Sequence, residues 1–392
     1  MRKWKEYKFS DFVLINPAVK LPSNEQVSFV EMKDLINGKR FCYPSSTRTN
    51  GGGAKFENRD TLFARITPCL ENGKICQVKG LKSGIGLGST EFLVFRGKPN
   101  VSDTDFVFYL SRWNEVRSHA EINLDGTSGR QRVPKECFNE LILNLPENLT
   151  EQTAIASVLS SLDDKIDLLH RQNATLEKMA ETLFKQWFVE EAKVEWESYK
   201  LKDLVKHVKP GTNYQPKRIE TGIPFLNVRN LSNGFLDLSD TTKISMEEYQ
   251  RIHKNWQPEE NDLLISRIGT LGIVAVIQRL DLPVAVHYNM INLKAKTTSY
   301  QFLYFLLKSS LFQEKYLSNI RQSVQEYVAI DDTENIEIAL PIGLEEFKKQ
   351  EPYFVELYNK IKSNQSQVRT LTSLRDNLLP KLMSGEVRVE MN

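Results

Sequence analysis

The sequence has little cysteine and no long hydrophobic run. Its longest apolar stretch, 271–277, is far short of the roughly 18 residues that a membrane span needs. The charged N-terminus lacks the apolar segment of a signal peptide, so we expect a cytoplasmic chain with no membrane contact. No CxxC pair occurs, which predicts free thiols rather than a zinc site or a disulfide framework. The four cysteines are Cys42, Cys69, Cys76 and Cys137.

A strong excess of one charge is also missing. The chain has 52 Lys and Arg against 50 Asp and Glu, a net charge of +2. Proteins that grip nucleic acid by bulk charge are usually more basic. Any nucleic-acid surface must therefore be local.

Motifs of catalysis are absent as well. There is no GxxxxGK[ST] loop and no HExxH, and the five histidines are scattered. The nearest approach to the Asn-Pro-Pro-aromatic stretch of adenine methyltransferases is NPAV at 16–19, which lacks the second proline and the aromatic residue. The glycine-rich stretches 51–53 and 84–88 lack a strand-turn-helix context, and we interpret them as turns or DNA-facing loops. We expect no catalytic residue and no metal site.

What the sequence does contain is a repeat. WKEYKFSDF at 4–12 returns as WESYKLKDL at 196–204. Such self-similarity indicates two copies of one domain. Four more pairs of blocks follow in the same order: 27–41 with 223–235, 59–66 with 261–268, 103–113 with 299–309, and 141–146 with 336–341.

Each copy has two parts that differ in pattern. Up to the Leu-Pro at its end, short β-like runs, Gly and Pro punctuation and one aromatic-rich helical stretch predict an α+β globule. Beyond it, apolar residues alternate at gaps of four and three, which is a heptad seam. The first seam is Ile155, Leu159, Leu162, Ile166, Leu169, Asn173, Leu176, Ala180, Leu183 and Trp187. The second is Phe354, Leu357, Ile361, Asn364, Val368, Leu371, Arg375, Leu378 and Leu382.

Two long helices with one narrow seam each most economically bury those seams against each other. Because the intervening domain must return the chain to its start, the pair should be antiparallel. Asn173 and Asn364 either fix the register at some cost in stability or are merely tolerated. Asn148 and Glu151 resemble a capping box that starts the first helix, while Arg375 and nearby Pro380 weaken the far end of the second.

Similar globules on a spacer suit a target with two parts a fixed distance apart. A helix of about 36 to 40 residues spans roughly 55 to 60 Å at about 1.5 Å per residue. One turn of B-DNA, the usual distance between half-sites, is about 34 to 36 Å, so such a helix would place the two globules between one and two turns apart. A protein partner with two sites could use the same layout.

The order globule, long helix, globule, long helix resembles the specificity subunit of type I restriction-modification systems. The phrases at 145–187, 260–277 and 373–389 carry the resemblance, which covers essentially the whole chain. It implies an α+β fold in which two similar target recognition domains are separated by two long helices that form an antiparallel coiled coil. The implied domains are target recognition domain 1 at 1–146, a central coiled-coil helix at 147–192, target recognition domain 2 at 193–341 and a C-terminal coiled-coil helix at 342–392.

The resemblance also implies partners. They are double-stranded DNA, read as two half-sites, two methyltransferase (modification) subunits, and ATP-dependent restriction subunits. S-adenosylmethionine, ATP and Mg²⁺ would belong to those subunits, and this non-catalytic chain would bind no cofactor. The alternatives are a stand-alone DNA methyltransferase or nuclease, and a protein-only coiled-coil scaffold.

Two features depart from the family pattern. A glycine often precedes the Asp of the repeated Asp-apolar-apolar phrase, but Arg59 and Asn261 stand there. A Gly-Ser/Thr loop common near the end of a recognition domain is present at 125–133, whereas its counterpart at 320–328 has no glycine. Either this loop is reshaped in the second copy, or the alignment is off by a few residues.

DNA contacts require Arg, Lys, Asn, Gln or hydroxyl side chains that reach base edges and phosphates. For each candidate alone, the alternative is a solvated loop residue. Arg65 and Arg267 recur between copies that should read different sequences, so they are phosphate contacts or structural ion pairs. The first copy offers Arg48, Asn50, Lys55, Arg130, Gln131 and Arg132, and the second offers Asn213, Tyr214, Gln215, Lys217, Arg218 and Arg229.

Overall fold

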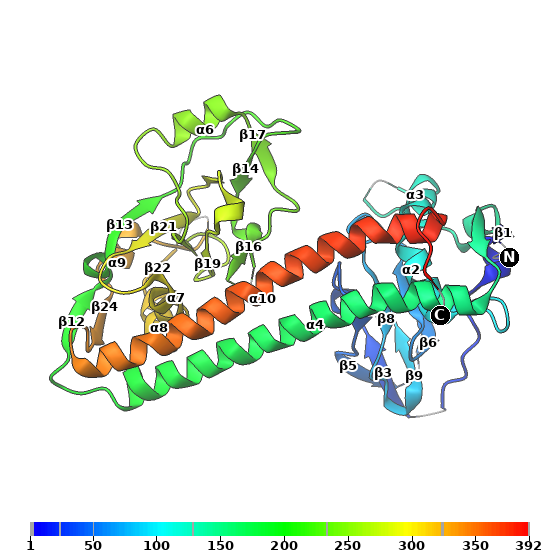
Figure 1. Ribbon diagram of the computed structural model, residues 1–392, viewed down its shortest axis with the longest axis horizontal. Helices are drawn as coiled ribbons and strands as arrows, with labels where there is room; N and C mark the ends of the chain where they lie inside the picture. Colours follow the sequence, from blue (N-terminus) through cyan, green and yellow to red (C-terminus); the bar gives the residue numbers. More distant parts are fainter. Residues whose placement is uncertain are drawn as a thin grey trace. The chain divides into compact units, whose positions relative to one another are not determined.

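The computed structural model describes residues 4–22, 25–49, 51–127, 129–232, 234–322 and 325–390. The chain forms two compact units: residues 1–171 with 365–392 (unit 1), and residues 172–364 (unit 2). Each unit holds one globular part and a portion of both long helices (Figure 1). We call the globular parts head 1 (residues 4–148) and head 2 (residues 191–344).

The described residues of head 1 form three sheets, three α-helices and three short 3-10 helices. Its first strand, β1, pairs antiparallel with its last, β11. The other sheets have the strand orders β2-β10-β7-β8-β4 and β5-β3-β9-β6. The strands are β1 (Trp4–Lys8), β2 (Val13–Ile15), β3 (Gln26–Val30), β4 (Phe41–Cys42), β5 (Ser46–Thr49), β6 (Ala54–Glu57), β7 (Thr61–Ala64), β8 (Ile75–Val78), β9 (Ile85–Gly88), β10 (Phe92–Gly97) and β11 (Ile142–Pro146). The helices are α1 (Phe9–Phe12), α2 (Thr104–Arg112) and α3 (Asn114–Ile122).

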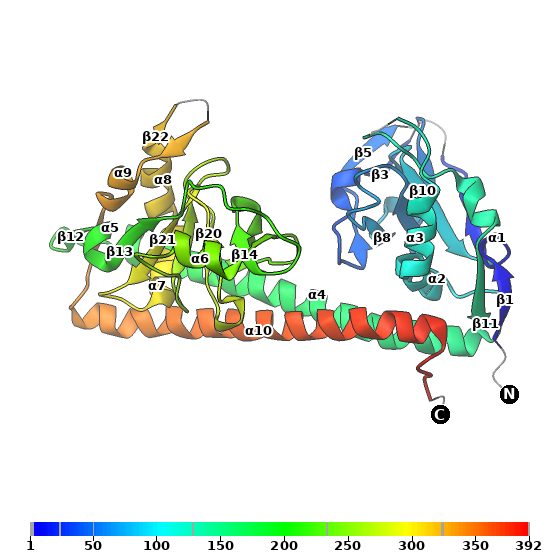
Figure 2. The same ribbon diagram turned by 90° about the horizontal axis from the view of Figure 1, so that it is seen from above.

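The core of head 1 lies between the five-stranded sheet and α2, which packs on β10, β7 and β8 (Figure 2). Asp103 starts α2 because its carboxylate accepts a hydrogen bond from the Phe106 amide. Phe106 is fully buried. The rings of Phe9, Phe95 and Phe138 pack at centroid distances of 5.1 to 5.3 Å, mostly edge to face.

Head 2 repeats this plan. Its first strand, β12, pairs antiparallel with β24, and further sheets have the orders β13-β21-β18-β19 and β17-β14-β20. The strands are β12 (Glu197–Lys200), β13 (Val205–Pro210), β14 (Ile223–Leu226), β15 (Leu231–Ser232), β16 (Phe235–Leu236), β17 (Thr242–Ile244), β18 (Leu263–Ser266), β19 (Val274–Val276), β20 (Ala285–Val286), β21 (Met290–Ala295), β22 (Ile320–Arg321), β23 (Tyr327–Val328) and β24 (Glu337–Leu340). The helices are α5 (Leu201–Leu204), α6 (Met246–Ile252), α7 (Tyr300–Lys308), α8 (Ser310–Ser318) and α9 (Ile330–Glu334).

The two long helices are α4 (Leu149–Lys185), which ends in a π-helical turn at Gln186–Glu190, and α10 (Glu345–Ser384). In unit 1, Ile166 and Leu169 of α4 pack with Val368 of α10. In unit 2, Leu176 and Ala180 of α4 pack in one cluster with Ile361 of α10. Residues further along α4 thus contact residues that come earlier on α10, so the two helices are antiparallel. The predicted fold class is confirmed.

Every residue of the two predicted seams is buried or half-buried. The seam pattern missed Phe184, Phe188 and Tyr358, which are buried in the aromatic core of unit 2. The expectation that Arg375 and Pro380 weaken the second helix is wrong, because α10 continues to Ser384. Arg375 is buried and its charge is compensated by Asp163, whose carboxylate lies 2.6 Å from Nη1.

The predicted capping box is present only in part. Asn148 does accept a hydrogen bond, from the Thr150 amide at 2.8 Å. Glu151 instead accepts from the Trp4 indole at 3.2 Å, because strand β1 brings that ring over the start of α4. The two seam asparagines contact each other: Asn364 Nδ2 donates to Asn173 Oδ1 at 2.8 Å.

Candidate nucleic-acid interface

Two of the predicted DNA contacts in head 1 lie on one face of the four-stranded sheet. Arg48 on β5 pairs with Val27, and Lys55 on β6 pairs with Leu87. Since side chains alternate between faces, this register places Arg48 and Lys55 on the same face at opposite edges. Asn50 lies outside the described residues.

The Arg48 side chain is held against the sheet. Its guanidinium carbon lies 3.6 Å from the centre of the Phe29 ring, and Nη2 lies 3.6 Å from Glu31. The side chain nevertheless keeps 55% of its surface exposed. It can therefore approach a phosphate without losing its support.

The glycine loop of head 1 is anchored through Arg132. This guanidinium makes a bidentate ion pair with Glu91, at 2.8 Å from Nη2 and 2.9 Å from Nε. Arg130 is exposed, and the Gln131 carbonyl accepts from the Thr67 amide. Arg132 is thus occupied by Glu91, whereas Arg130 forms no ion pair with a described residue.

The repeated arginines occupy equivalent places but have different partners. Arg267 donates from Nε to the Val328 carbonyl at 3.0 Å and from Nη1 to the Tyr288 carbonyl at 3.4 Å, and burial lowers its pKa. Arg65 Nε is buried without a hydrogen-bond partner among the described residues. Neither forms an ion pair within the described part of the chain. Arg65 lines a pocket of about 460 Å³ together with Lys55 and Thr90.

In head 2 the loop after β13 lies over β20 and β21. The Thr212 amide donates to the Val286 carbonyl, and Gln215 Nε2 lies 3.4 Å from His287 Nε2. Tyr214 is tied to α6, because its hydroxyl accepts from Arg251 at 3.0 Å. Asn213, Lys217 and Arg218 are exposed.

Arg229 lies apart from this loop, in the short turn after β14, where it pairs with Asp240 at 3.4 Å. Both side chains are more than half exposed, so the pair contributes little to stability. Arg229 remains accessible to a partner.

The glycine-free segment of head 2 is a reshaped loop, not an alignment error. The Val133 amide donates to the Arg65 carbonyl, and the Val328 amide donates to the Arg267 carbonyl in the same way. This shared contact fixes the correspondence of the two segments. In head 1 the segment is closed by a single antiparallel bridge between Asp125 and Arg132, whereas in head 2 the two residue pairs of the hairpin β22–β23 close it.

The stretch 84–88, interpreted above as a turn or loop, is mostly a strand. Residues Ile85–Gly88 form β9, between β3 and β6. A Cβ atom at Gly86 or Gly88 would lie 2.8 Å from the Phe56 ring, so these glycines make room for that ring. Residues 51–53 do connect two strands, as predicted, and a Cβ at Gly53 would lie 2.2 Å from the Gly88 carbonyl oxygen.

Each head buries the repeated aspartate. Asp60 binds Arg96 through two bonds of 2.6 and 2.7 Å; burial raises its pKa while Arg96 opposes the shift. Asp262 forms no ion pair with any described residue; its carboxylate accepts from Asn292 Nδ2 at 2.8 Å and from the Glu259 amide at 2.9 Å, and burial raises its pKa to about 6. These are structural carboxylates inside the sheets, remote from solvent.

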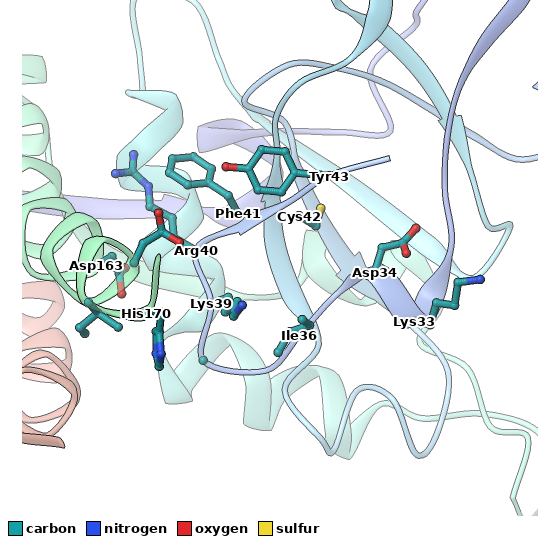
Figure 3. A pocket seen from close by; sticks show the side chains of 13 residues that line it. Lys33, Asp34, Ile36, Lys39, Arg40, Phe41, Cys42, Tyr43, Asp163 and His170 are labelled. Carbon is teal, nitrogen blue, oxygen red and sulfur yellow. The ribbon is translucent and has the colours of Figure 1, made fainter. Parts of the chain in front are cut away.

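A second pocket, of about 290 Å³, lies in unit 1 between residues 33–43 and α4 (Figure 3). Arg40 and His170 project toward it from head 1 and α4 (Figure 3). Arg40 is neutralised by Asp105 at 3.3 Å and Asp164 at 3.5 Å, and burial lowers the pKa of His170. None of the predicted DNA contacts lines it.

Within the described residues, no group of three or more His, Cys, Asp and Glu side chains could hold a metal ion. None of the described helices combines the length and the hydrophobicity that a membrane span requires. All four cysteines are free thiols; Cys42 and Cys76 are buried, and Cys69 and Cys137 half-buried.

Comparison with known proteins places this architecture in a family. The chain is 24% identical to the HindI specificity subunit of Haemophilus influenzae, over 99% of this chain and 100% of that protein. It is 27% identical to the MjaIX specificity subunit of Methanocaldococcus jannaschii, over 73% of this chain and 70% of that protein. The crystal structure of a type I S subunit from M. genitalium has the same fold, with a TM-score of 0.52 and 17% identity over 100% of this chain and 97% of that one.

The family model of the type I restriction modification DNA specificity domain matches twice, at residues 1–178 and 193–371. Each match takes in one head and most of the long helix that follows it. The two matches together cover most of the sequence, in the order that the internal repeat predicts. The chain therefore belongs to the type I restriction modification DNA specificity family.

Proposed function

We propose that this chain is the specificity subunit of a type I restriction-modification complex, and that it selects a bipartite DNA target for two modification subunits and the ATP-dependent restriction subunits. Residues 1–146 and 193–341 are its target recognition domains, and the helices around 147–192 and 342–392 set the gap between the half-sites. The chain itself is non-catalytic and works in the cytoplasm. S-adenosylmethionine, ATP and Mg²⁺ bind to its partners.

One observation carries this proposal: the two heads share a framework but differ where they meet solvent. The framework contact from Val133 to Arg65 recurs as Val328 to Arg267. The loop at this contact is closed by a single bridge and contains Gly126 and Gly129 in head 1, whereas in head 2 it is closed by two residue pairs and has no glycine. Two domains that recognise different DNA sequences can share a scaffold but must differ in their contact surfaces, because contacts to bases determine which sequence is recognised.

The predicted DNA contacts remain part of the proposal. In head 1 they are Arg48, Asn50, Lys55, Arg65, Arg130, Gln131 and Arg132, and in head 2 they are Asn213, Tyr214, Lys217, Arg218, Arg229 and Arg267. Given the contacts of its guanidinium, we assign Arg267 a mainly structural role. Lys55 and Arg130 in head 1, and Lys217 and Arg218 in head 2, are exposed and form no ion pair within the described residues, so they are open to phosphates.

Docking of the modification subunits is supported by the outer side of α4. A shallow apolar groove of about 530 Å³ in unit 2 is lined by Ala174, Met179 and Leu183 among others. Met179, in the last two turns of α4, is 49% exposed. Exposed apolar side chains on a paired helix suit a further helix packed against them.

The test is methylation mapping by long-read sequencing in cells that express a modification subunit with and without this chain. A split motif that appears only with the chain would support the proposal. Exchanging residues 1–146 for the matching part of the Haemophilus relative should then change one half of the motif. No new motif would favour a protein scaffold, and a motif from this chain alone would favour an enzyme.

A further inference from the structure

Strand β5 is the most exposed strand of head 1. All four of its residues, Ser46 to Thr49, are exposed, whereas four of the five residues of its neighbour β3 are buried. β5 lies at the edge of its sheet and is paired only on one side. Its polar side chains are therefore exposed to solvent, while its pairing with β3 fixes their positions along the strand.

Three side chains share one face of this ribbon. The register pairs Gln26 with Thr49 and Ser28 with Thr47, which places Gln26, Thr47 and Thr49 on the same side. Gln26, Thr47 and Thr49 are exposed. None of the three is among the predicted DNA contacts, because most of those lie in segments expected to be loops, whereas these residues lie on strands.

The amide of Gln26 is oriented before any partner arrives. Thr47 Oγ1 donates to Gln26 Oε1 at 3.1 Å, across the two strands. This bond uses one lone pair of Oε1 and leaves the second lone pair and both Nε2 protons available. A glutamine amide with one acceptor and one donor free can bind the N6 and N7 edge of adenine in a bidentate manner.

The chemistry of the ribbon favours nucleic acid over protein. Its exposed groups are hydroxyls, one amide and the Arg48 guanidinium, with no large apolar side chain on β5. Protein interfaces bury aromatic and aliphatic anchors, which this strand lacks. Arg48, on the opposite face, is supported by Phe29 and can contact a phosphate beside the bases read by its neighbours.

We propose that the β3–β5 ribbon is a base-reading element of head 1, with Gln26 contacting an adenine and Thr47 positioning its amide. This rests on the proposed function and adds to it the residues and the base that one head reads. A two-stranded ribbon fits the major groove of B-DNA, where adenine presents a donor and an acceptor.

The experiment maps methylation with the full chain and its modification subunits, comparing wild type with Gln26→Ala and Thr47→Val. Domain exchange identifies the half-motif that head 1 recognises. With Gln26→Ala, the preference for one A·T pair over other base pairs in that half-motif should fall roughly tenfold to a hundredfold. Thr47→Val, which keeps the side-chain shape, should relax the same position less. The half-motif of head 2 should not change.

A matched control is Gln301→Ala in head 2. Gln301 is also a glutamine whose amide bonds another side chain, Asn359 at 3.3 Å, but it lies on α7. It should leave both half-motifs intact. If wild type gives a split motif and Gln26→Ala, folded as judged by thermal melting, gives the same one, the base-reading role is wrong while the specificity role stands. Absence of a wild-type motif would instead remove the proposed function itself.

Discussion

Units 1 and 2 attach similar heads to the same pair of helices, but the polar groups at the contact differ. In unit 1, Tyr109 donates to Asp163 of α4 at 2.7 Å, and Arg375 of α10 donates to the same carboxylate. In unit 2, Tyr304 donates to Glu177 of α4 at 3.0 Å, and the cation beside it, Lys308, comes from the head. The tyrosine-carboxylate bond is present in both units, while the source of the cation has changed.

This difference shows what duplication constrains. A buried hydroxyl or carboxylate must find a partner, since an unpaired polar group in the interior is costly. Any element that can reach the site satisfies that need. Both units therefore place a cation beside the carboxylate. In unit 1 it is Arg375 of the long helix α10, and in unit 2 it is Lys308 of the head.

The largest expected effect comes from removing the carboxylate in unit 1. Asp163→Ala would remove the buried carboxylate partner of Arg375 and leave it only the carboxylate of Asp376 among the described residues, a side chain that is 56% exposed. Arg375 lies beside Arg112, whose pKa is already lowered by burial and by Arg375. Breaking a buried pair in this way should cost unit 1 about 3 to 5 kcal/mol. Methionine oxidation in a urea gradient reports the units separately, through buried Met383 in unit 1 and buried Met290 in unit 2.

Only the Met383 transition should move to lower urea. Arg171→Ala is the control, because it removes an exposed i,i+4 pair with Asp167 on the same helix, which contributes little. Equal shifts for the two variants would mean that the buried pair does not hold unit 1 together. A shift of Met290 would mean that the units unfold as one.

The sequence predicted the parts of this comparison that repeat along the chain. The two globules, both long helices and the seams follow from periodic patterns, which local spacing reveals. The partners of buried groups did not follow, because they depend on residues distant in sequence. Arg267 bonds the carbonyl of Val328, 61 positions away, and its copy Arg65 has no equivalent bond.

A second difference between the heads should appear as opposite responses to one substitution. Burial raises the pKa of Asp262 to about 6 from 3.8, so folded head 2 binds more protons than the unfolded chain between about pH 4 and 6. Its stability should fall as pH rises through this window and stay lower above it. Asp262→Asn removes this penalty and should stabilise head 2 at pH 7.5 by about 1 to 3 kcal/mol.

The matched variant is Asp60→Asn in head 1. It loses the two charge-assisted bonds from Arg96 and should lower the stability of head 1. Methionine oxidation at Met290 and Met32 separates the heads, and repeating the Asp262→Asn measurement at pH 4.5 should show most of its gain gone. A gain for Asp262→Asn that is the same at both pH values would contradict the raised pKa.

The smallest effect tests the residues that stand where the family often has glycine. Asn261 has φ +68° and Arg59 has φ +75°, a left-handed conformation that suits glycine best. The side-chain oxygen of Asn261, Oδ1, is also buried and has no hydrogen-bond partner among the described residues. Asn261→Gly removes both costs and should stabilise head 2 by about 0.5 to 1 kcal/mol, whereas Asn261→Ala should destabilise it.

Arg59→Gly sharpens the comparison, because Arg59 also donates to Asp105 at 2.8 Å. The backbone gain there is offset by the loss of an exposed ion pair worth about 0 to 1 kcal/mol, so head 1 should change little. The readouts are the urea midpoints at Met290 and Met32. If the glycine at 59 stabilised its head as much as the glycine at 261, the ion pair would contribute nothing, and the left-handed backbone alone would account for the family's preference.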